Sequence, residues 1–384
     1  MTKRVGWRSL VPGVHQVDRQ MEQPAEVPVE RATVSAGLSL GWLGFGAAPL
    51  GNLYREVADA DADGAVAAAI RLGLRYFDVA PQYGRGLAEE RLGSLLARHA
   101  GTAGVTLSSK VGIRLVPLAP GEVEPGSIFK SNRALRPEFD YSYDGALRSI
   151  EASSLRLGRS IDIAYGHDLG RRTHGEQHER RLAEFLDGAY RALSDLRAAG
   201  EIQAIGIGVN ECEVCEEFLR FADLDLILLA GRYTLLEQDA LDSLLPLCTA
   251  RGVRVVIGGP YNSGILATGT RRNNGTLYYD YRPASSGVLE RVKAIEAVCD
   301  AYGITIAAAA LQFPLGHPQV VSVIPGLASA EEVAAAAARM QVRIPPQFWE
   351  ELKSNALIRS DAPTPAPVDQ NVSQHSMVGG LESR

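Results

Sequence analysis

Hydrophobic and polar positions along this chain alternate in a rhythm of short strands and longer helices that starts near residue 43 and continues to residue 340. Short apolar runs ending at Gly or Pro are typical of buried strands, and apolar residues spaced three and four positions apart are typical of amphipathic helices. These patterns predict strands at 43–46, 76–79, 105–109, 161–165, 202–208, 226–229, 253–257 and 320–324.

Helices are predicted between and after these strands. Their expected ranges are 59–72, 89–97, 142–157, 181–199, 214–221, 238–250, 287–302, 306–313 and 330–340. A repeated strand–helix unit, present eight times, predicts an α/β fold of the (β/α)8 TIM-barrel type. A doubly wound open sheet is the alternative, but it normally has a Gly-rich fingerprint after its first strand, and Gly44-Phe45-Gly46 followed by Pro49 lacks that pattern.

Several additions to the barrel are expected. A hairpin over residues 31–40, turning at Ala36-Gly37, precedes the first strand. Long loops follow strands three and seven, and an extra helix lies near the carboxyl end. These three segments are 112–140, 258–284 and 347–357. The predicted domain organisation is a flexible extension at 1–28, a barrel at 29–359 and a disordered tail at 360–384.

Composition narrows the class of protein. The chain has 384 residues, of which 46% are hydrophobic and 22% charged, as in ordinary globular proteins. It has no apolar run of about eighteen residues and no signal-peptide core, so a cytoplasmic protein without a membrane partner is expected. The net charge of −6 and the lack of a basic block argue against nucleic-acid binding.

No metal site is expected from the cysteines and histidines. Cys212 and Cys215 have the spacing of a zinc pair, but no second pair or nearby His completes a site, and the segment reads as the first turn of a helix. His174 and His178 lie in an Arg-rich loop rather than at strand ends. The sequence therefore favours a metal-free site.

Four reactive side chains follow three successive predicted strands. Asp78 ends the second strand, with Tyr83 in the loop beyond; Lys110 follows the third strand; and His167 follows the fourth. In a barrel of parallel strands these ends meet on one face. Taken singly, each residue also fits a packing, capping or surface role. Taken together, their placement predicts a catalytic site.

The chemistry of such a set favours proton exchange with an alcohol or carbonyl. A free phenol has a pKa of about 10, which a neighbouring ammonium lowers. A carboxylate fixes the lysine, and a histidine orients a carbonyl oxygen. Since no side chain donates hydride, a nicotinamide cofactor is implied.

Residues 77–84, Ser109-Lys110 and Tyr165–Asp168 resemble the corresponding segments of the aldo-keto reductase family, with similarity from about residue 41 to residue 338. The resemblance implies that Tyr83 is the general acid/base, that Lys110 and Asp78 tune it, and that His167 orients the substrate. Segments 139–145, 229–236 and 258–266 are similar to the bacterial aldose 1-dehydrogenase branch of that family, which includes enzymes acting on L-fucose, D-threo-aldoses and pyridoxal.

The same resemblance implies where the cofactor binds. The expected contacts are Asn210, Gly258, Gly259, Pro260, Asn262, Ser263, Gly264, Ile324, Gly326 and Glu332. Two departures are visible: Gly258 or Gly259 replaces a family aromatic residue, and Ala230 replaces a family Gln. Tyr261 or Arg232 can help to hold the nicotinamide ring, although Arg232 equally fits an ion pair with Glu237 or an aspartate.

NAD is expected in preference to NADP. Gly326 lies where NADP-preferring relatives carry Lys, and Glu331-Glu332 lie near the position of their Arg. A carboxylate repels a 2′-phosphate but can accept hydrogen bonds from ribose hydroxyls. The two glutamates also fit the first turn of a helix through its dipole.

The function predicted is NAD-dependent oxidation of the anomeric hydroxyl of an aldose to a lactone. Alternatives are a pyridoxal-type hemiacetal, a carbonyl reductase of a secondary pathway, or a cofactor-binding regulatory subunit. Basic residues in the 112–140 loop either meet a polyhydroxyl or acidic ligand or are solvated charges; they are Arg114, Lys130, Arg133 and Arg136. The sugar and the oligomeric state stay open.

Overall fold

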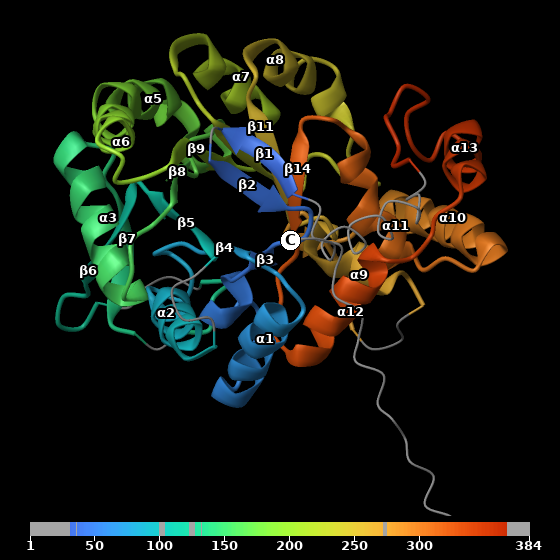
Figure 1. Ribbon diagram of the computed structural model, residues 1–384, viewed down its shortest axis with the longest axis horizontal. Helices are drawn as coiled ribbons and strands as arrows, with labels where there is room; N and C mark the ends of the chain where they lie inside the picture. Colours follow the sequence, from blue (N-terminus) through green and yellow to red (C-terminus); the bar gives the residue numbers. More distant parts are fainter. Residues whose placement is uncertain are drawn as a thin grey trace, which may run out of the picture.

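The computed structural model describes residues 31–35, 37–99, 104–122, 127–131, 133–271 and 275–366. Eight parallel strands lie side by side in the order β14-β11-β10-β9-β8-β5-β4-β3. The two edges meet through parallel bridges that pair Leu43 with Val323 and Gly46 with Gly326, which closes the sheet into a barrel. Figure 1 shows the strands at the centre with helices around them. The predicted (β/α)8 barrel is confirmed.

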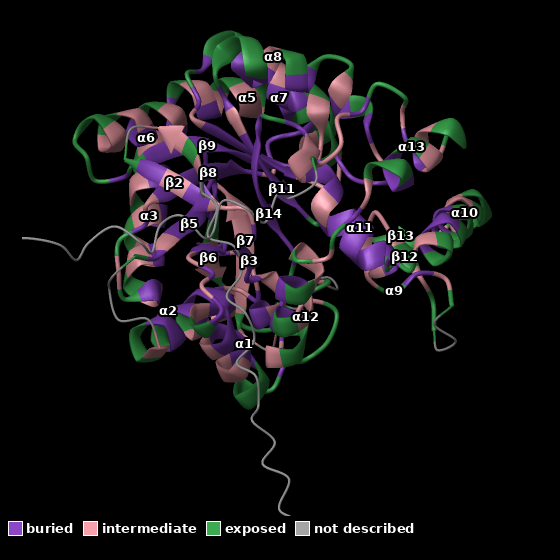
Figure 2. Cartoon of the chain, turned by 45° about the vertical axis from the view of Figure 1, so that its right-hand side comes forward, coloured by how far each residue is buried: buried purple, intermediate pink, exposed green. Residues whose placement is uncertain are grey.

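The barrel strands agree with the predicted ranges to within two residues at most ends. They are β3 (Phe45–Gly46), β4 (Tyr76–Asp78), β5 (Thr106–Val111), β8 (Ile163–His167), β9 (Ala204–Val209), β10 (Leu226–Ala230), β11 (Arg254–Gly258) and β14 (Val320–Ile324). Lys110 and His167 are thus the second-last and last residues of their strands rather than the residues just after them. Figure 2 shows that the barrel strands are almost entirely buried.

Side chains of the barrel strands pack on two sides of the wall, as alternation along a strand requires. Those on the inner side form a small core within the barrel, which includes Tyr76, Tyr165 and Ile324. The predicted hairpin is present as β1 (Arg31–Ser35) and β2 (Leu38–Gly41), and its Leu38 and Leu40 join this inner core. Those on the outer side pack against the helices.

The helices surround the barrel. They are α1 (Asp59–Arg71), α2 (Leu87–His99), α3 (Tyr143–Leu157), α4 (Arg171–His174), α5 (His178–Asp187), α6 (Ala189–Ala198), α7 (Cys212–Phe221), α8 (Leu244–Arg251), α9 (Ile265–Thr268), α10 (Ser286–Tyr302), α11 (Ile306–Gln312), α12 (Ala330–Met340) and α13 (Pro346–Ser354). Short 3-10 helices at Ala48–Gly51, Gly175–Gln177, Asp239–Leu241, Asn262–Gly264 and Phe313–Gly316 complete the connections.

Two predicted helices differ from those in the structure. The single helix expected at 181–199 is split into α5 and α6 at Gly188, where a β-carbon would lie 2.5 Å from the carbonyl oxygen of Tyr141. The helix expected at 238–250 begins as a 3-10 turn and becomes helical only at Leu244. In the first case a close contact with a distant segment, invisible to local periodicity, breaks the helix.

The two long loops contain hairpins that the sequence did not reveal. The loop after β5 forms β6 (Ile113–Pro117) paired with β7 (Leu135–Phe139). The loop after β11 forms β12 (Tyr278–Tyr279) paired with β13 (Arg282–Pro283), which turns through left-handed backbone at Asp280 and Tyr281. Both loops leave the carboxyl ends of barrel strands.

The predicted extension and tail can be compared with the structure only in part. The extension at 1–28 and residues 367–384 lie outside the described residues. Past residue 359 the described chain continues against the barrel, since Ala362 is buried and Thr364 lies against Gly316. Among the described residues, no single helix is long and apolar enough to cross a membrane. One bent pair of helical segments, Ser286–Tyr302 and Ile306–Gly316, is long and apolar enough only when the two segments are taken together.

Candidate active site

A buried ion pair lies at the carboxyl ends of β4 and β5. The Nζ atom of Lys110 donates a hydrogen bond of 2.7 Å to Asp78 Oδ2 and one of 2.9 Å to the carbonyl oxygen of Val79. Both charged side chains are almost completely shielded from solvent. Register explains the encounter, because β4 and β5 are paired in parallel and Asp78 lies opposite Ser108, two residues before Lys110. The predicted meeting of these two residues is therefore present.

A hydrogen-bonded chain of hydroxyl groups supports the other oxygen of Asp78. Ser108 Oγ donates to Asp78 Oδ1 at 2.7 Å and lies 3.1 Å from the hydroxyl of Tyr76, which in turn lies 3.2 Å from the hydroxyl of Tyr165. All these side chains are buried. The carboxylate is thus held on both oxygens, which fixes the position of the lysine.

Tyr83 lies over this ion pair from the loop between β4 and α2. Lys110 Nζ is 4.8 Å from the centre of the Tyr83 ring, and the ring of His167 meets it edge-on with 6.1 Å between ring centres. On another side, Phe129 from the β6–β7 insert stacks on the phenol at 5.6 Å. The four predicted residues therefore converge on one point of the barrel mouth.

Electrostatics at Tyr83 differ from the expectation that Lys110 lowers its pKa. Burial, together with the negative charges of Asp78 and Asp168, holds the pKa of the Tyr83 phenol well above its ordinary value. Asp78 and Lys110 are already paired with each other, so the ammonium does little to favour a phenolate. At neutral pH Tyr83 is a phenol that can donate a proton.

His167 is arranged as a neutral side chain. Burial and the charge of Lys110 lower its pKa, against the opposite effect of Asp168 and Asp78. Its Nε2 atom lies 3.8 Å from Asp168 Oδ1, and its buried Nδ1 atom has no hydrogen-bond partner within the described part of the chain. The ring of His167 thus lies beside Tyr83 with one ring nitrogen unpaired among the described residues.

Glycine and proline follow β11 where relatives are expected to carry an aromatic residue. Gly258 ends the strand, and Gly259 has φ +54, a left-handed conformation that favours glycine. Pro260 is buried. The two glycines leave the end of β11 without a side chain next to Ala230, to which Gly258 is paired.

The turn at 262–264 has left-handed backbone at three successive residues, with φ of 44, 60 and 99°. Asn262 donates from Nδ2 to the carbonyl oxygen of Gly231 at 3.2 Å, and its buried Oδ1 has no partner among the described residues. Ser263 Oγ accepts a hydrogen bond of 2.9 Å from the backbone N–H of Tyr281. This turn therefore presents polar groups and fixes the neighbouring hairpin.

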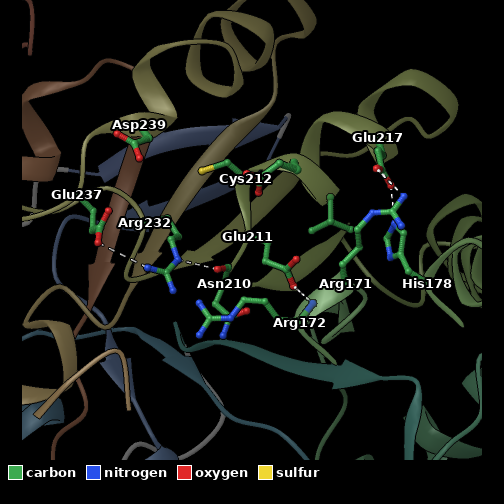
Figure 3. A pocket seen from close by; sticks show the side chains of 12 residues that line it. Arg171, Arg172, His178, Asn210, Glu211, Cys212, Glu217, Arg232, Glu237 and Asp239 are labelled. Atoms are coloured by element: carbon green, nitrogen blue, oxygen red, sulfur yellow. Dashed lines mark hydrogen bonds and ion pairs between the residues drawn. The ribbon is translucent and has the colours of Figure 1, made fainter. Parts of the chain in front are cut away.

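Asn210, at the end of β9, borders a cavity of about 510 Å³ between the loops after β8, β9 and β10 (Figure 3). Arg232 donates from Nε to the carbonyl oxygen of Asn210 at 2.7 Å and from a terminal nitrogen to Asp280 Oδ1 at 2.6 Å. Glu237 Oε1 lies 3.8 Å from a terminal nitrogen of Arg232. The ion pair that the sequence allowed for Arg232 is therefore present.

Asp280 links three loops across the mouth of the barrel. It accepts hydrogen bonds from Arg232, after β10, and from Arg172, on α4 after β8, at 2.6 and 2.8 Å. The two arginines lower the pKa of its carboxyl against the effect of burial. The hairpin that follows β11 is thereby fixed above the site, with Tyr281 close enough to Tyr83 to influence its pKa.

The three predicted cofactor residues in and after β14 have different surroundings. Ile324, the last residue of β14, is buried in the inner barrel core. Gly326 is exposed beside Pro49. Glu332 accepts a hydrogen bond of 2.8 Å from the backbone N–H of Ala328 and lies 3.5 Å from Arg55, while Ser329 Oγ caps α12. Glu332 thus acts in a capping arrangement at the helix start.

Sequence reasoning did not identify four residues that surround the site: Phe129, Tyr141, Asp280 and Tyr281. Phe129 and Tyr281 lie on long inserts whose path has no local signal. Tyr141 belongs to the segment 139–145, whose similarity to the aldose branch marked it without giving it a role. Asp280 had only its charge as a signal, and its partners are distant in sequence.

Several other polar candidates have structural partners. In the β6–β7 insert, Arg114 pairs with Glu138, Arg133 with Glu90 and Arg136 with Glu122. His178 is buried between Glu217 and the carbonyl oxygen of Leu169. Among the residues that the structure describes, no group of three His, Cys, Asp or Glu side chains is arranged to hold a metal ion.

Comparison with known proteins gives consistent matches. Residues 42–356 match the model of the Aldo/keto reductase family. Pyridoxal 4-dehydrogenase from Microbacterium luteolum is 42% identical, over 86% of this chain and 98% of that protein. D-threo-aldose 1-dehydrogenase from a Pseudomonas species is 38% identical, over 88% of this chain and 99% of that protein.

Solved structures share the fold at lower identity. The holo form of aldo-keto reductase AKR11C1 from Bacillus halodurans superimposes with a TM-score of 0.65 at 22% identity, covering 89% of this chain and 99% of that one. Glycerol dehydrogenase AKR11B4 from Gluconobacter oxydans gives the same TM-score at 19% identity, over 90% and 98% of the two chains.

Proposed function

This chain belongs to the aldo/keto reductase family, and on that premise we propose that it is an NAD-dependent dehydrogenase of cyclic hemiacetals. The proposed reaction oxidises the anomeric hydroxyl of an aldose. The hydroxyl proton would pass to a base and a bound nicotinamide would supply the hydride acceptor, so that the anomeric carbon becomes the carbonyl of a lactone. Convergence of Tyr83, Lys110, Asp78 and His167 carries the proposal.

Each of the four residues has a proposed part in proton transfer. Tyr83 exchanges the proton with the substrate oxygen, since it is the titratable hydroxyl at the point of convergence. Lys110, fixed by Asp78, stabilises negative charge that develops on the phenol oxygen. The ring of neutral His167, beside Tyr83, donates a hydrogen bond to the same substrate oxygen and orients it.

The residues present fit a nicotinamide cofactor, which when bound accepts or returns a hydride at C4 of its ring. Asn262 Oδ1 is a buried acceptor that lacks a partner in the described structure. Gly258 and Gly259 place no side chain at the end of β11. Asn210 adds an amide at the end of β9. We assign these residues, with Pro260, Ser263 and Gly264, to the cofactor's side of the mouth.

The proposed preference for NAD is supported by Gly326, which places no basic side chain after β14. At the exposed Gly326 there is no side chain to pair with a 2′-phosphate. Glu332 contributes negative charge, although its carboxylate is shared between the helix cap and Arg55. The absence of a lysine at residue 326 therefore supports the preference more strongly than the presence of Glu332.

A pyridoxal-type hemiacetal is the second candidate substrate. It is favoured by the 42% identity to pyridoxal 4-dehydrogenase, which exceeds the 38% identity to the aldose enzyme. The bond broken is of the same kind in both reactions, because pyridoxal also closes to a cyclic hemiacetal. The proposed roles of Tyr83 and His167 are therefore the same for either substrate.

The test is to incubate the purified protein with NAD, and separately NADP, and follow absorbance at 340 nm with a panel of aldoses and pyridoxal. We expect reduction of NAD with at least one hemiacetal and a lower kcat/KM with NADP. Consumption of NADH by aldehydes or ketones, with no hemiacetal oxidised, would replace the proposal with a carbonyl reductase. Binding of cofactor without any turnover would favour a regulatory subunit.

A further inference from the structure

Asp168, the residue after His167, adopts an uncommon backbone conformation at the mouth of the barrel. Its φ of 51° lies in the left-handed region, which Asp and Asn tolerate better than other residues with a side chain. Its backbone N–H donates to the carbonyl oxygen of Gly208 at 3.1 Å. The end of β8 is therefore a sharp corner that turns the side chain of Asp168 away from the direction of the strand.

Tyr141 braces this corner from the segment that precedes α3. Its hydroxyl donates to the carbonyl oxygen of His167 at 2.8 Å and also lies 3.0 Å from His174 Nε2 and 3.4 Å from the carbonyl oxygen of Asp168. The ring fits because residue 112 is glycine, where a β-carbon would lie 2.2 Å from Tyr141 Cε1. Tyr141 is fully buried, so the corner is held by a rigid support.

The carboxylate of Asp168 is directed to the catalytic residues. Its Oδ1 atom is 3.8 Å from His167 Nε2, and its charge raises the pKa of both Tyr83 and Tyr281. The side chain is 31% exposed, so it borders both the site and solvent. A substrate that reaches Tyr83 and His167 thus passes close to this carboxylate.

Within the described residues, Asp168 has no Lys or Arg partner, unlike Asp78 and Asp280. Asp78 is paired with Lys110, and Asp280 is paired with two arginines. In the described part of the chain, the one ion-pair contact of Asp168 is His167, whose lowered pKa keeps it neutral near pH 7. Asp168 therefore brings an uncompensated negative charge to the mouth.

Aromatic side chains lie on the outer side of the same opening. Tyr281 is 48% exposed at the turn of the β12–β13 hairpin, and the rings of Tyr54 and Tyr278 stack at 6.4 Å. Such rings pack well on the flat C–H faces of sugars and on heteroaromatic rings. The opening thus combines flat apolar surfaces with one free carboxylate.

We propose that Asp168 is a specificity-determining residue, which accepts hydrogen bonds from hydroxyl or ring N–H donors of a neutral or cationic substrate and excludes substrates that carry a carboxylate or phosphate. This inference rests on the proposed function in placing the substrate between Tyr83 and His167. A carboxylate receives two or more donors, as vicinal hydroxyls provide. The same charge repels an anionic group that approaches it in a partly dehydrated site.

The experiment compares the wild-type enzyme with Asp168→Asn in the direction of carbonyl reduction by NADH. Asparagine keeps the size and the tolerance for left-handed backbone, and it removes the charge. The substrates are 4-nitrobenzaldehyde and 4-carboxybenzaldehyde, both activated by an electron-withdrawing group and differing in charge. We expect the ratio of kcat/KM for the carboxylated to the nitro aldehyde to rise about tenfold or more in Asp168→Asn, since unfavourable like-charge contacts of this kind are strong.

Glu290→Gln serves as the matched control, because it also removes one negative charge but from an exposed position on α10. It should leave the ratio unchanged. A ratio in Asp168→Asn within twofold of wild type, or an equal loss of both activities with NADH binding retained, would overturn the inference. Failure of the proposed function is separable: it would appear as no oxidation of any hemiacetal by the wild-type enzyme, whatever happens to this ratio.

Discussion

Asp78 and Lys110 form an ion pair of 2.7 Å beneath the ring of Tyr83, with both charges removed from solvent. Burial raises the pKa of the Tyr83 phenol, and the nearby charge of Asp78 raises it further. In the proposed mechanism the lysine, held by Asp78, stabilises charge that develops on the phenol during proton transfer.

Removing one partner of this pair should destabilise the fold more than removing both charges. We expect Lys110→Met to lower the free energy of unfolding by about 3–5 kcal/mol, because the carboxylate of Asp78 is left buried and unpaired. Urea unfolding of Lys110→Met, Asp78→Asn and the double variant measures this. The double variant should regain most of the stability but no turnover; equal stability of the single and double variants would refute a coupled pair.

The raised pKa of Tyr83 predicts different pH profiles for the two reaction directions. Reduction of a carbonyl needs the protonated phenol, so kcat/KM for reduction should stay level from about pH 6 to pH 9. Oxidation needs the deprotonated phenol, so kcat/KM for oxidation should rise with pH over that range without a plateau. A plateau in oxidation near pH 7 would show that the pKa is lowered instead.

Alkaline pH should also destabilise the fold. Burial raises the pKa of Tyr76, Tyr141, Tyr165 and Tyr233, and that of Tyr54 to about 12. A group whose pKa is higher in the folded state contributes stability that is complete below its unfolded pKa, about 10 for Tyr, and is lost as pH rises toward the folded value. These tyrosines should therefore not change the melting temperature between pH 7 and 9, and they should lower it above pH 10.

Tyr141→Phe tests the support that Tyr141 gives to the backbone of His167 at the end of β8. Loss of the hydroxyl removes the hydrogen bond to the carbonyl oxygen of His167, so we expect a loss of about 1 kcal/mol in stability and a several-fold lower kcat. KM for NAD should not change. Tyr143→Phe, which removes an exposed hydrogen bond to Asp195, is the control and should keep its kcat. Equal kcat in both variants would limit Tyr141 to packing.

Asp280→Asn tests the link between the loops of the mouth. The amide keeps the left-handed turn but weakens the charge-assisted hydrogen bonds to Arg172 and Arg232. The β12–β13 hairpin should become more sensitive to limited proteolysis, and KM for substrate should rise several-fold. Asp300→Asn, which weakens an exposed pair with Arg271 in the same loop, should have neither effect.

Much of the fold follows from local patterns in the sequence. The buried strand Val320–Ile324 and the helix Ala330–Met340 have the predicted limits, because each is bounded by strong local signals such as the Ser329 cap. Gly188 shows what such patterns miss. The helix there is interrupted by contact with Tyr141, which is distant in sequence and becomes a neighbour only in the folded chain.

The site was predictable in its inner part and not in its outer part. Asp78, Lys110 and His167 lie on barrel strands, so the parallel topology alone brings them to one face. Phe129, Asp280 and Tyr281 lie on inserts, whose positions depend on contacts with other loops. The direction of the Tyr83 pKa shift depends chiefly on burial, which the local sequence does not specify.

The most direct test of the central claim compares Tyr83→Phe with the wild-type enzyme, using NAD and the hemiacetal that the wild type oxidises best. Binding of NADH, measured by its fluorescence, reports on the cofactor site in both proteins. The proposed proton transfer predicts that Tyr83→Phe binds NADH normally and loses at least about 100-fold in kcat. A variant that binds NADH and retains the wild-type kcat would contradict the role assigned to Tyr83.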